Sequence, residues 1–218
     1  MEKKEQLYEG KAKKVYATDD PNVVIVSYKD DATAFNGLKK GTITGKGAIN
    51  NRMTNNLMRR LEEKGVPTHY VQELSDRETA VKKVQIVPLE VIIRNISAGS
   101  FAKRYGVEEG IVFDAPTIEF SYKNDDLGDP LITPDGLEAI GVMTLDQYAQ
   151  MKAMTQKISG IVKDTLAEKG LDLYDIKFEF GYYNGEVILI DEIASGNMRV
   201  YKDGEIVEPT DLTKLILG

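Results

Sequence analysis

Two lysines near the N-terminus have types and spacing that could do chemistry. Lys11 and Lys13 lie in the segment Gly10-Lys-Ala-Lys, within a stretch that alternates like a β-strand. Such alternation sends both ammonium groups to one face, while Gly10 and Ala12 leave the backbone open to a ligand. This pattern suits a polyphosphate; the alternative is a solvated lysine-rich strand, because lysines usually lie at surfaces. The sequence lacks the Gly-x4-Gly-Lys-Ser/Thr pattern of a P-loop.

A group of charged residues near the C-terminal end could bind a metal ion. Lys177 and Glu179 alternate with apolar residues, and Asp191 follows the next predicted strand after the turn signal Tyr183-Asn-Gly. A two-residue Asn-Gly turn would pair Phe178 with Asp191 and leave Glu179 on the opposite face. A three-residue loop would instead pair Lys177 with Asp191, and Glu179 would share their face. Two converging carboxylates could hold magnesium, whereas the alternative is an exposed charged sheet face.

Arg94 ends an apolar run and begins a segment rich in small residues and hydroxyls, which continues to Ser100. A helix is expected to start there, and this geometry favours a phosphate or a carboxylate. A guanidinium that emerges from an apolar run also needs an anionic partner. The alternative is simple helix capping. Asp129, in an acidic turn, and Arg199, just past the acidic hairpin, are weak signals by themselves.

The elements that must position these residues are mixed. Apolar residues every four positions predict a helix over 48–64, which ends at Gly65. A capping box at Thr144 predicts a second helix that ends before Gly170. The segments 7–16 and 23–28 are expected to form an antiparallel hairpin. With no regular βαβ repeat, the pattern favours an α+β fold, and Pro88, within a strand predicted over 84–93, suggests domains at 1–87 and 88–218.

Composition excludes several kinds of site. The 218 residues contain no cysteine and one histidine, His69, so thiolate metal sites, disulfides, multi-histidine metal sites and a cysteine nucleophile are ruled out. The net charge of -7 argues against long-range attraction to nucleic acid or to an anionic membrane. With no signal peptide and no run of about 18 apolar residues, we expect a soluble, cytoplasmic protein.

Several short motifs follow one another in a fixed order along the chain: Tyr8-Glu-Gly-Lys-Ala-Lys13, Asp31-Ala-Thr-Ala-Phe-Asn-Gly37, Gly45-Lys-Gly47 with Asn50-Asn51, Arg94-Asn95 with Ala98-Gly-Ser100, Asp129-Pro130, Lys177-Phe-Glu-Phe-Gly181 and Asp191-Glu192. Taken in order, these motifs resemble the SAICAR synthetase (phosphoribosylaminoimidazole-succinocarboxamide synthase) family of purine biosynthesis. The resemblance implies a two-lobed, ATP-grasp-related α+β fold, with an N-terminal antiparallel sheet and a larger C-terminal lobe. It also implies ligation of L-aspartate to the carboxylate of 5-aminoimidazole-4-carboxylic acid ribonucleotide (CAIR), with ATP and Mg²⁺.

The resemblance also implies roles for particular residues. Those expected to bind ATP are Lys11, Ala12, Lys13, Val15, Ile86 and Lys123. Those expected to bind the ribonucleotide or lie near the substrates are Glu90, Arg94, Ser100, Asp129, Asp175, Lys177 and Arg199. Lys13, Lys177 and Arg199 are the expected catalytic residues, and Glu179 and Asp191 the expected magnesium ligands, in the register of the three-residue loop.

One departure from the family pattern bears on activity. Where the family usually has Ser-Pro-Asp, this chain has Ala194-Ser-Gly, which predicts a more mobile loop before Arg199. The alternative to an active ligase is therefore a catalytically weakened nucleotide-binding or regulatory homologue. We also expect a homo-oligomer, a dimer in the simplest case, with small-molecule substrates as its other partners.

Overall fold

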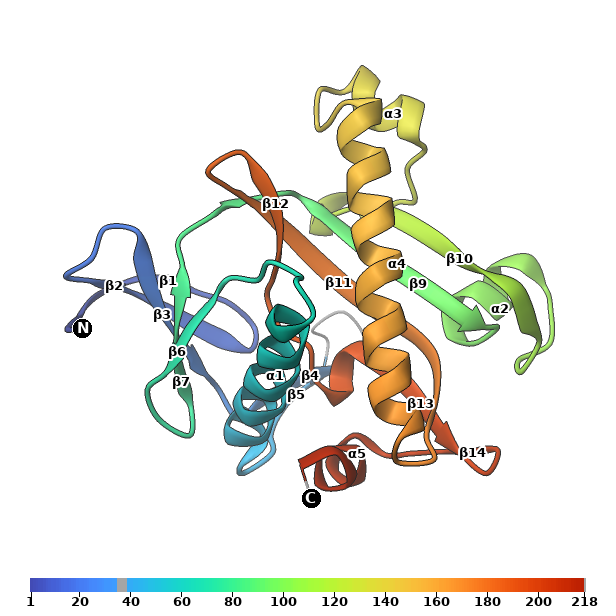
Figure 1. Cartoon of the computed structure of the whole chain (residues 1–218), viewed down its shortest axis with the longest axis horizontal. Coiled ribbons are helices and arrows are strands. Elements are labelled where there is room, and N and C mark those ends of the chain that lie inside the picture. The colour runs from blue at the N-terminus through green and yellow to red at the C-terminus, as the bar shows by residue number, and fades with distance from the viewer. Residues whose placement is uncertain (35–38, 218) are drawn as a thin grey trace.

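The computed structural model describes residues 1–34 and 39–217, so Phe35, Asn36 and Gly37 of the family motif lie outside it. The protein has the expected α+β architecture, with two main antiparallel sheets (Figure 1). The five-stranded sheet has the order β1-β2-β3-β7-β6. The seven-stranded sheet has the path β10-β9-β11-β13-β14, with β8 and β12 also paired to β11. A separate hairpin pairs β4 with β5.

The strands are β1 (Lys3–Glu9), β2 (Lys13–Thr18), β3 (Val23–Tyr28), β4 (Asp31–Ala34), β5 (Lys39–Thr42), β6 (Tyr70–Glu73), β7 (Glu78–Lys82), β8 (Gln85–Ile86), β9 (Leu89–Ile96), β10 (Val112–Tyr122), β11 (Asp172–Tyr183), β12 (Glu186–Ile190), β13 (Met198–Lys202) and β14 (Glu205–Ile206). The helices are α1 (Lys46–Glu63), α2 (Gly99–Tyr105), α3 (Pro134–Ala139), α4 (Leu145–Ala167) and α5 (Pro209–Leu217), with 3-10 turns η1 (Asp125–Leu127) and η2 (Ser195–Asn197). None of the described helices is long and apolar enough to cross a membrane.

The N-terminal segment corrects one prediction. Residues 7–16 do not form a single strand, because the chain reverses after β1, and β2 pairs with both β1 and β3. The Gly10 N–H donates to the carbonyl of Lys13 at 2.8 Å and closes the turn. Alternation of polar and apolar residues continues through such a tight turn, so the pattern alone did not reveal the reversal. Lys11 therefore lies at the turn, and Lys13 at the start of β2.

The two long helices agree with the prediction within a few residues. α4 begins with the expected capping box, in which Thr144 Oγ1 accepts from the Gln147 N–H and Gln147 Oε1 accepts from the Thr144 N–H. α1 ends where Gly65 adopts a left-handed conformation, with φ of 72°. At the other end of α1, Asp30 accepts from the N–H groups of Gly45 and Gly47 and also binds Arg77.

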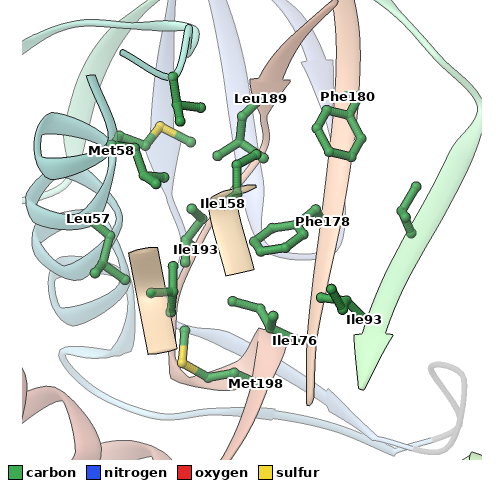
Figure 2. Packing of buried hydrophobic residues seen from close by; sticks show 14 of the residues in the cluster. Leu57, Met58, Ile93, Ile158, Ile176, Phe178, Phe180, Leu189, Ile193 and Met198 are labelled. Carbon is green, nitrogen blue, oxygen red and sulfur yellow. The ribbon is translucent and has the colours of Figure 1, made fainter. Parts of the chain in front are cut away.

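The main core lies between the larger sheet and the helices α1 and α4 (Figure 2). Ile176, Phe178 and Phe180 project from one face of β11 into this core and are almost fully buried. Leu57 and Met58 of α1 and Ile158 of α4 belong to the same cluster (Figure 2). By the alternation of a strand, Asp175, Lys177 and Glu179 lie on the opposite face of β11. Because the core covers one face of β11, the charged residues lie on the other face.

The connection between the sheets lies close to the predicted domain boundary. The strand predicted over 84–93 is divided, and Val87 and Pro88 separate β8 from β9. Gly181 on β11 allows β8 to approach, because a Cβ on this glycine would lie 2.8 Å from Val84 Cγ2. A second link is the segment before β6, where the His69 N–H donates to the Leu189 carbonyl on β12. The division at 87/88 into two domains stays a prediction.

Candidate active site

A cavity of about 550 Å³ lies between the two sheets. One side is formed by residues of β1, β2, β3 and β7, and the other by residues of β11 and β12. The lining is mostly apolar, and its charged residues are Lys13, Lys82, Lys83, Lys123, Glu179 and Asp191. Apolar walls around a few charged groups are typical of a site for an organic ligand that carries charge.

The hairpin that carries Glu179 and Asp191 has the register of a two-residue turn. Tyr183 pairs with Glu186 and Glu179 pairs with Ile190, so the expected three-residue loop is wrong. Asn184 and Gly185 form the turn with φ of 52° and 86°. Positive φ at both central residues is the geometry in which an Asn-Gly pair connects two twisted strands most easily.

Glu179 and Asp191 nevertheless line the same cavity. Regular alternation after Ile190 would send the Asp191 side chain to the opposite face. The strand ends at Ile190, however, and Asp191 adopts a left-handed conformation with φ of 64°. Aspartate tolerates this conformation better than most residues. The left-handed backbone at Asp191 thus brings its carboxylate to the cavity that Glu179 lines, although the register of the hairpin alone would place the two side chains on opposite faces.

Each of these two carboxylates is paired with a lysine. Lys13 Nζ donates to Asp191 Oδ1 at 2.5 Å, and Lys123 Nζ lies 2.7 Å from both Oε1 and Oε2 of Glu179. Lys13 Nζ is also 3.4 Å from Glu192 Oε2, a buried oxygen with no hydrogen-bond partner among the described residues. Two lysine–carboxylate pairs, Lys13 with Asp191 and Lys123 with Glu179, therefore lie at the cavity.

The ionisation of these groups reflects burial and pairing. Burial alone would raise the pKa of Asp191, but the charge and hydrogen bond of Lys13 outweigh it and lower the pKa to about 2. Burial, together with the nearby Asp191 charge, raises the pKa of Glu179 despite the opposing effect of Lys123. Burial lowers the pKa of His69, which also lines the cavity, to about 4, so this histidine is neutral at pH 7.

The residues present fit a magnesium ion. Glu179 and Asp191 offer carboxylate oxygens on one cavity, which are the ligands that Mg²⁺ prefers. Among the described residues, no group of three or more histidine or acidic side chains is arranged to hold a metal ion. Magnesium commonly keeps several waters and takes further oxygens from substrate phosphates, so two protein ligands are sufficient.

A second cavity, of about 380 Å³, lies further along the same face of β11. The expected substrate residues that line it are Arg94, Ser100, Asp175, Lys177 and Arg199. Four of them lie on β9, β11 and β13, which are neighbouring strands of the larger sheet. Ser100 lies on α2, the helix that follows β9. Ser195, Gly196 and Asn197 of η2 complete the lining beside Arg199.

Arg94 is buried and already has anionic partners within the chain. Its guanidinium is 1% exposed and binds Glu119 at 2.9 Å and Asp175 at 2.6 Å. Its Nη2 also donates to Ser100 Oγ at 2.9 Å. Two carboxylates within the chain therefore supply the anion that this guanidinium needs, and its contact with a ligand stays a prediction. Arg199, which is half exposed, donates from Nη1 to both oxygens of Asp175, at 2.9 Å to Oδ2, which Arg94 also binds, and at 3.1 Å to Oδ1.

Some expected site residues lie away from the linings of these two cavities. Lys11 is 60% exposed and lies 3.5 Å from Asp125, so it does not share a face with Lys13 as expected. Ala12 is in the same turn. Asp129 accepts from the Asn124 N–H at 2.7 Å and shapes its own loop. The expected nucleotide residues Val15 and Ile86 do line the larger cavity, and Glu90 binds Lys177 at 2.6 Å.

Three charged residues next to these groups received no role from the sequence. Glu119 joins Arg94 to Arg104, Glu192 lies beside Lys13, and Lys82 lines the larger cavity. The available signal for Glu119 was an acid between the apolar residues Ile118 and Phe120 of a strand, since an acid that becomes buried there needs a cationic partner. No pattern in the sequence identified Lys82, because a lysine at the end of a strand usually lies in solvent.

Fold and site together define an α+β protein with an inter-sheet cavity suited to a ligand that combines an apolar group with charge. A family model described as SAICAR synthetase matches residues 6–214. The chain is 58% identical over 201 residues to phosphoribosylaminoimidazole-succinocarboxamide synthase of Lachnoclostridium phytofermentans, covering 92% of this chain and 86% of that protein. The corresponding enzyme of Clostridium acetobutylicum is 52% identical over 203 residues, with coverage of 93% and 86%.

Solved structures agree with this relationship. The phosphoribosylaminoimidazole-succinocarboxamide synthase of Ehrlichia chaffeensis superposes with a TM-score of 0.90 at 39% identity, covering 98% of this chain and 92% of that one. A SAICAR synthetase in complex with ADP superposes with a TM-score of 0.89 at 38% identity, covering 98% and 91%. The chain belongs to the SAICAR synthetase family.

Proposed function

We propose that this chain joins L-aspartate to the carboxylate of 5-aminoimidazole-4-carboxylic acid ribonucleotide and converts ATP to ADP and phosphate. Membership of the family supports this reaction. The observation that carries it is the arrangement of two cavities along one face of β11, one with lysine–carboxylate pairs and the other with arginines. The ADP complex of a related SAICAR synthetase supports nucleotide binding by this chain, and we assign the nucleotide to the first cavity because of its lysines.

A carboxylate is a poor acyl donor, so the reaction must activate it. A substrate carboxylate oxygen attacks the γ-phosphorus of ATP, the bond from that phosphorus to the bridging oxygen breaks, and ADP leaves. The aspartate amine then attacks the acyl phosphate, loses a proton, and phosphate departs as the amide forms. No protein nucleophile is needed, which agrees with a chain that has no cysteine. Catalysis then depends on positioning and on neutralising phosphate charge.

In this proposal, the chain's own residues bind and orient. Lys13 and Lys123 would contact nucleotide phosphates, and Val15 and Ile86 would pack near the adenine. Arg199 and Lys177 would bind the ribonucleotide in the second cavity, where Asp175 and Glu90 hold their side chains by ion pairs. Glu179 and Asp191 would hold Mg²⁺, which when bound neutralises part of the charge on the transferring phosphoryl group.

The test is the substrate dependence of ADP release by the purified protein. ADP should appear only when both the imidazole carboxylate ribonucleotide and L-aspartate are present with ATP and magnesium. Release of ADP that is independent of both substrates would contradict the proposal. Binding of nucleotide without any turnover would instead support the catalytically weakened homologue that the sequence left open.

A further inference from the structure

Both carboxylates expected to bind the metal ion are held by lysines that are expected to bind phosphate. Lys13 Nζ binds Asp191 at 2.5 Å, and Lys123 Nζ contacts both oxygens of Glu179 at 2.7 Å. Both members of each pair line the same cavity. A cation that binds these carboxylates must therefore compete with the ammonium groups for their oxygens.

One member of each pair is well shielded from water, so this competition matters. The side chains of Lys13 and Glu179 are 15% and 9% exposed, and those of their partners Asp191 and Lys123 are 31% and 41% exposed. Ion pairs in such surroundings are screened much less than pairs at the surface. A lysine displaced from its carboxylate therefore needs another anion in the cavity, and the phosphates of a nucleotide would supply one.

Glu192 provides a second partner for one of the two lysines. Its Oε2 is buried, has no hydrogen bond within the described chain, and lies 3.4 Å from Lys13 Nζ. Lys13 can therefore leave Asp191 with only a small movement and remain next to an acid. Lys123 has no acid other than Glu179 within ion-pair distance among the described residues.

We propose that Lys13 and Lys123 occupy the divalent-cation site of the nucleotide-free protein, so that the cation and the nucleotide phosphates displace them together. This inference rests on the proposed function, because it takes from it the ligands of the cation and the phosphates. When the phosphates draw the lysines away, Asp191 and Glu179 become free to bind the cation. Each ligand thus increases the affinity for the other, as linkage between two sites requires.

The experiment measures Mn²⁺ binding to the nucleotide-free protein by electron paramagnetic resonance, without any assay of activity. Lys13→Met and Lys123→Met keep much of the side-chain volume and free one carboxylate each. We expect each variant to bind Mn²⁺ about tenfold more tightly than the unmodified protein, as loss of a charged competitor implies.

Lys82→Met is the matched control. Lys82 lines the same cavity and carries the same charge, but its Nζ donates to the Thr68 carbonyl at 2.8 Å and not to a carboxylate. Loss of this lysine changes the electrostatic potential without freeing a metal ligand, so we expect a much smaller gain in Mn²⁺ affinity. Gains at positions 13 and 123 no larger than the gain at position 82 would overturn the proposal.

The result is separable from the test of the proposed function. If the unmodified protein shows the expected substrate-dependent ADP release but the three lysine variants bind Mn²⁺ equally, only the exchange is wrong. If Mn²⁺ affinity rises selectively at positions 13 and 123 while ADP release ignores the substrates, the exchange stands and the reaction assigned to the site is wrong. Circular dichroism of each variant checks that it is folded.

Discussion

Gly99 lies directly against the guanidinium of Arg199, so closely that a Cβ at position 99 would be 2.4 Å from Arg199 Nη2 and 2.5 Å from Cζ. Gly99 begins α2 with φ of 55°, and its N–H donates to Glu109 at 2.8 Å. The first turn of α2 therefore packs against the Arg199 guanidinium, which binds Asp175.

The first prediction tests this contact. In Gly99→Ala, the new methyl group must push the Arg199 side chain away from Asp175, because the end of a long side chain moves more easily than the backbone. We expect the KM for the ribonucleotide to rise about tenfold or more, since a displacement of this size at a positioning residue is costly. Steady-state kinetics with the ribonucleotide as the varied substrate measure it.

Gly106→Ala is the control for backbone strain. Gly106 follows the same helix with φ of 64°, and nothing lies within 4 Å of the position of its Cβ. An alanine there is strained by a similar amount but touches neither cavity. Similar KM values for the two variants would show that strain, and not the contact with Arg199, explains the effect.

The second prediction separates the two lysines of the N-terminal motif. Lys13→Ala removes a buried cation from the larger cavity, where we propose that the nucleotide binds, and should lower kcat/KM for ATP about 100-fold. Lys11→Ala removes a lysine that is 60% exposed, so we expect a smaller loss, mainly in KM. Equal and small effects of the two substitutions would support the alternative that Lys13 is a solvated lysine with no contact to the nucleotide.

The third prediction concerns pH. The pKa of Asp191 falls from 3.8 to about 2 on folding, so its ionised form stabilises the folded chain. That contribution is present above about pH 4 and disappears as the pH falls towards 2. Asp191→Asn should therefore cost more free energy of unfolding at pH 5 than at pH 3, as urea unfolding at the two pH values measures.

Glu179→Gln should show the opposite dependence. The pKa of Glu179 is raised, so its contribution to stability is present at low pH and declines as the pH rises through its folded value. The cost of Glu179→Gln should accordingly fall between pH 3 and pH 7. Parallel pH profiles for the two variants would contradict the opposite shifts of the two carboxylates.

The fourth prediction tests the core that orients β11. Ile158 of α4 is completely buried in the cluster shown in Figure 2. Ile158→Ala should lower the free energy of unfolding by about 2–5 kcal/mol, because it leaves a cavity in a packed interior. Ile111→Ala, at a side chain that is 45% exposed, should change it by only about 0.5 kcal/mol or less. Urea unfolding of both variants gives the comparison.

The sequence predicted the elements whose signals are local. The helix that begins after Thr144 has its capping box and its periodic apolar face in the sequence itself, and the structure agrees. Which residues would meet across the cavity could not be obtained in this way. Asp191 reaches the face of Glu179 through its own φ of 64°, although the hairpin has the register that should separate them. That conformation depends on packing around the residue and has no signature in the sequence.

The N-terminal turn shows a similar limit. A regular alternation suggested one strand with Lys11 and Lys13 on the same face, but Lys11 lies in the turn that runs from Gly10 to Lys13, and Lys13 begins β2. For Arg94, the apolar run indicated that an anion is needed but not which one; the partners are Glu119 and Asp175 on the neighbouring strands β10 and β11. Strand pairing decided both outcomes, between adjacent segments at the turn and between distant segments at Arg94.

The strand β11, which is twelve residues long, sets the distance between the two cavities. Asp175 and Lys177 border one cavity, and Glu179, two residues after Lys177, borders the other. All three lie on a single strand that is paired with neighbouring strands on both sides. Each step of two residues spans about 7 Å. Under the proposed function, the distance from acceptor to phosphoryl donor is therefore set by one extended segment, and a single residue inserted between Lys177 and Glu179 would turn one of these two charged side chains towards the hydrophobic core.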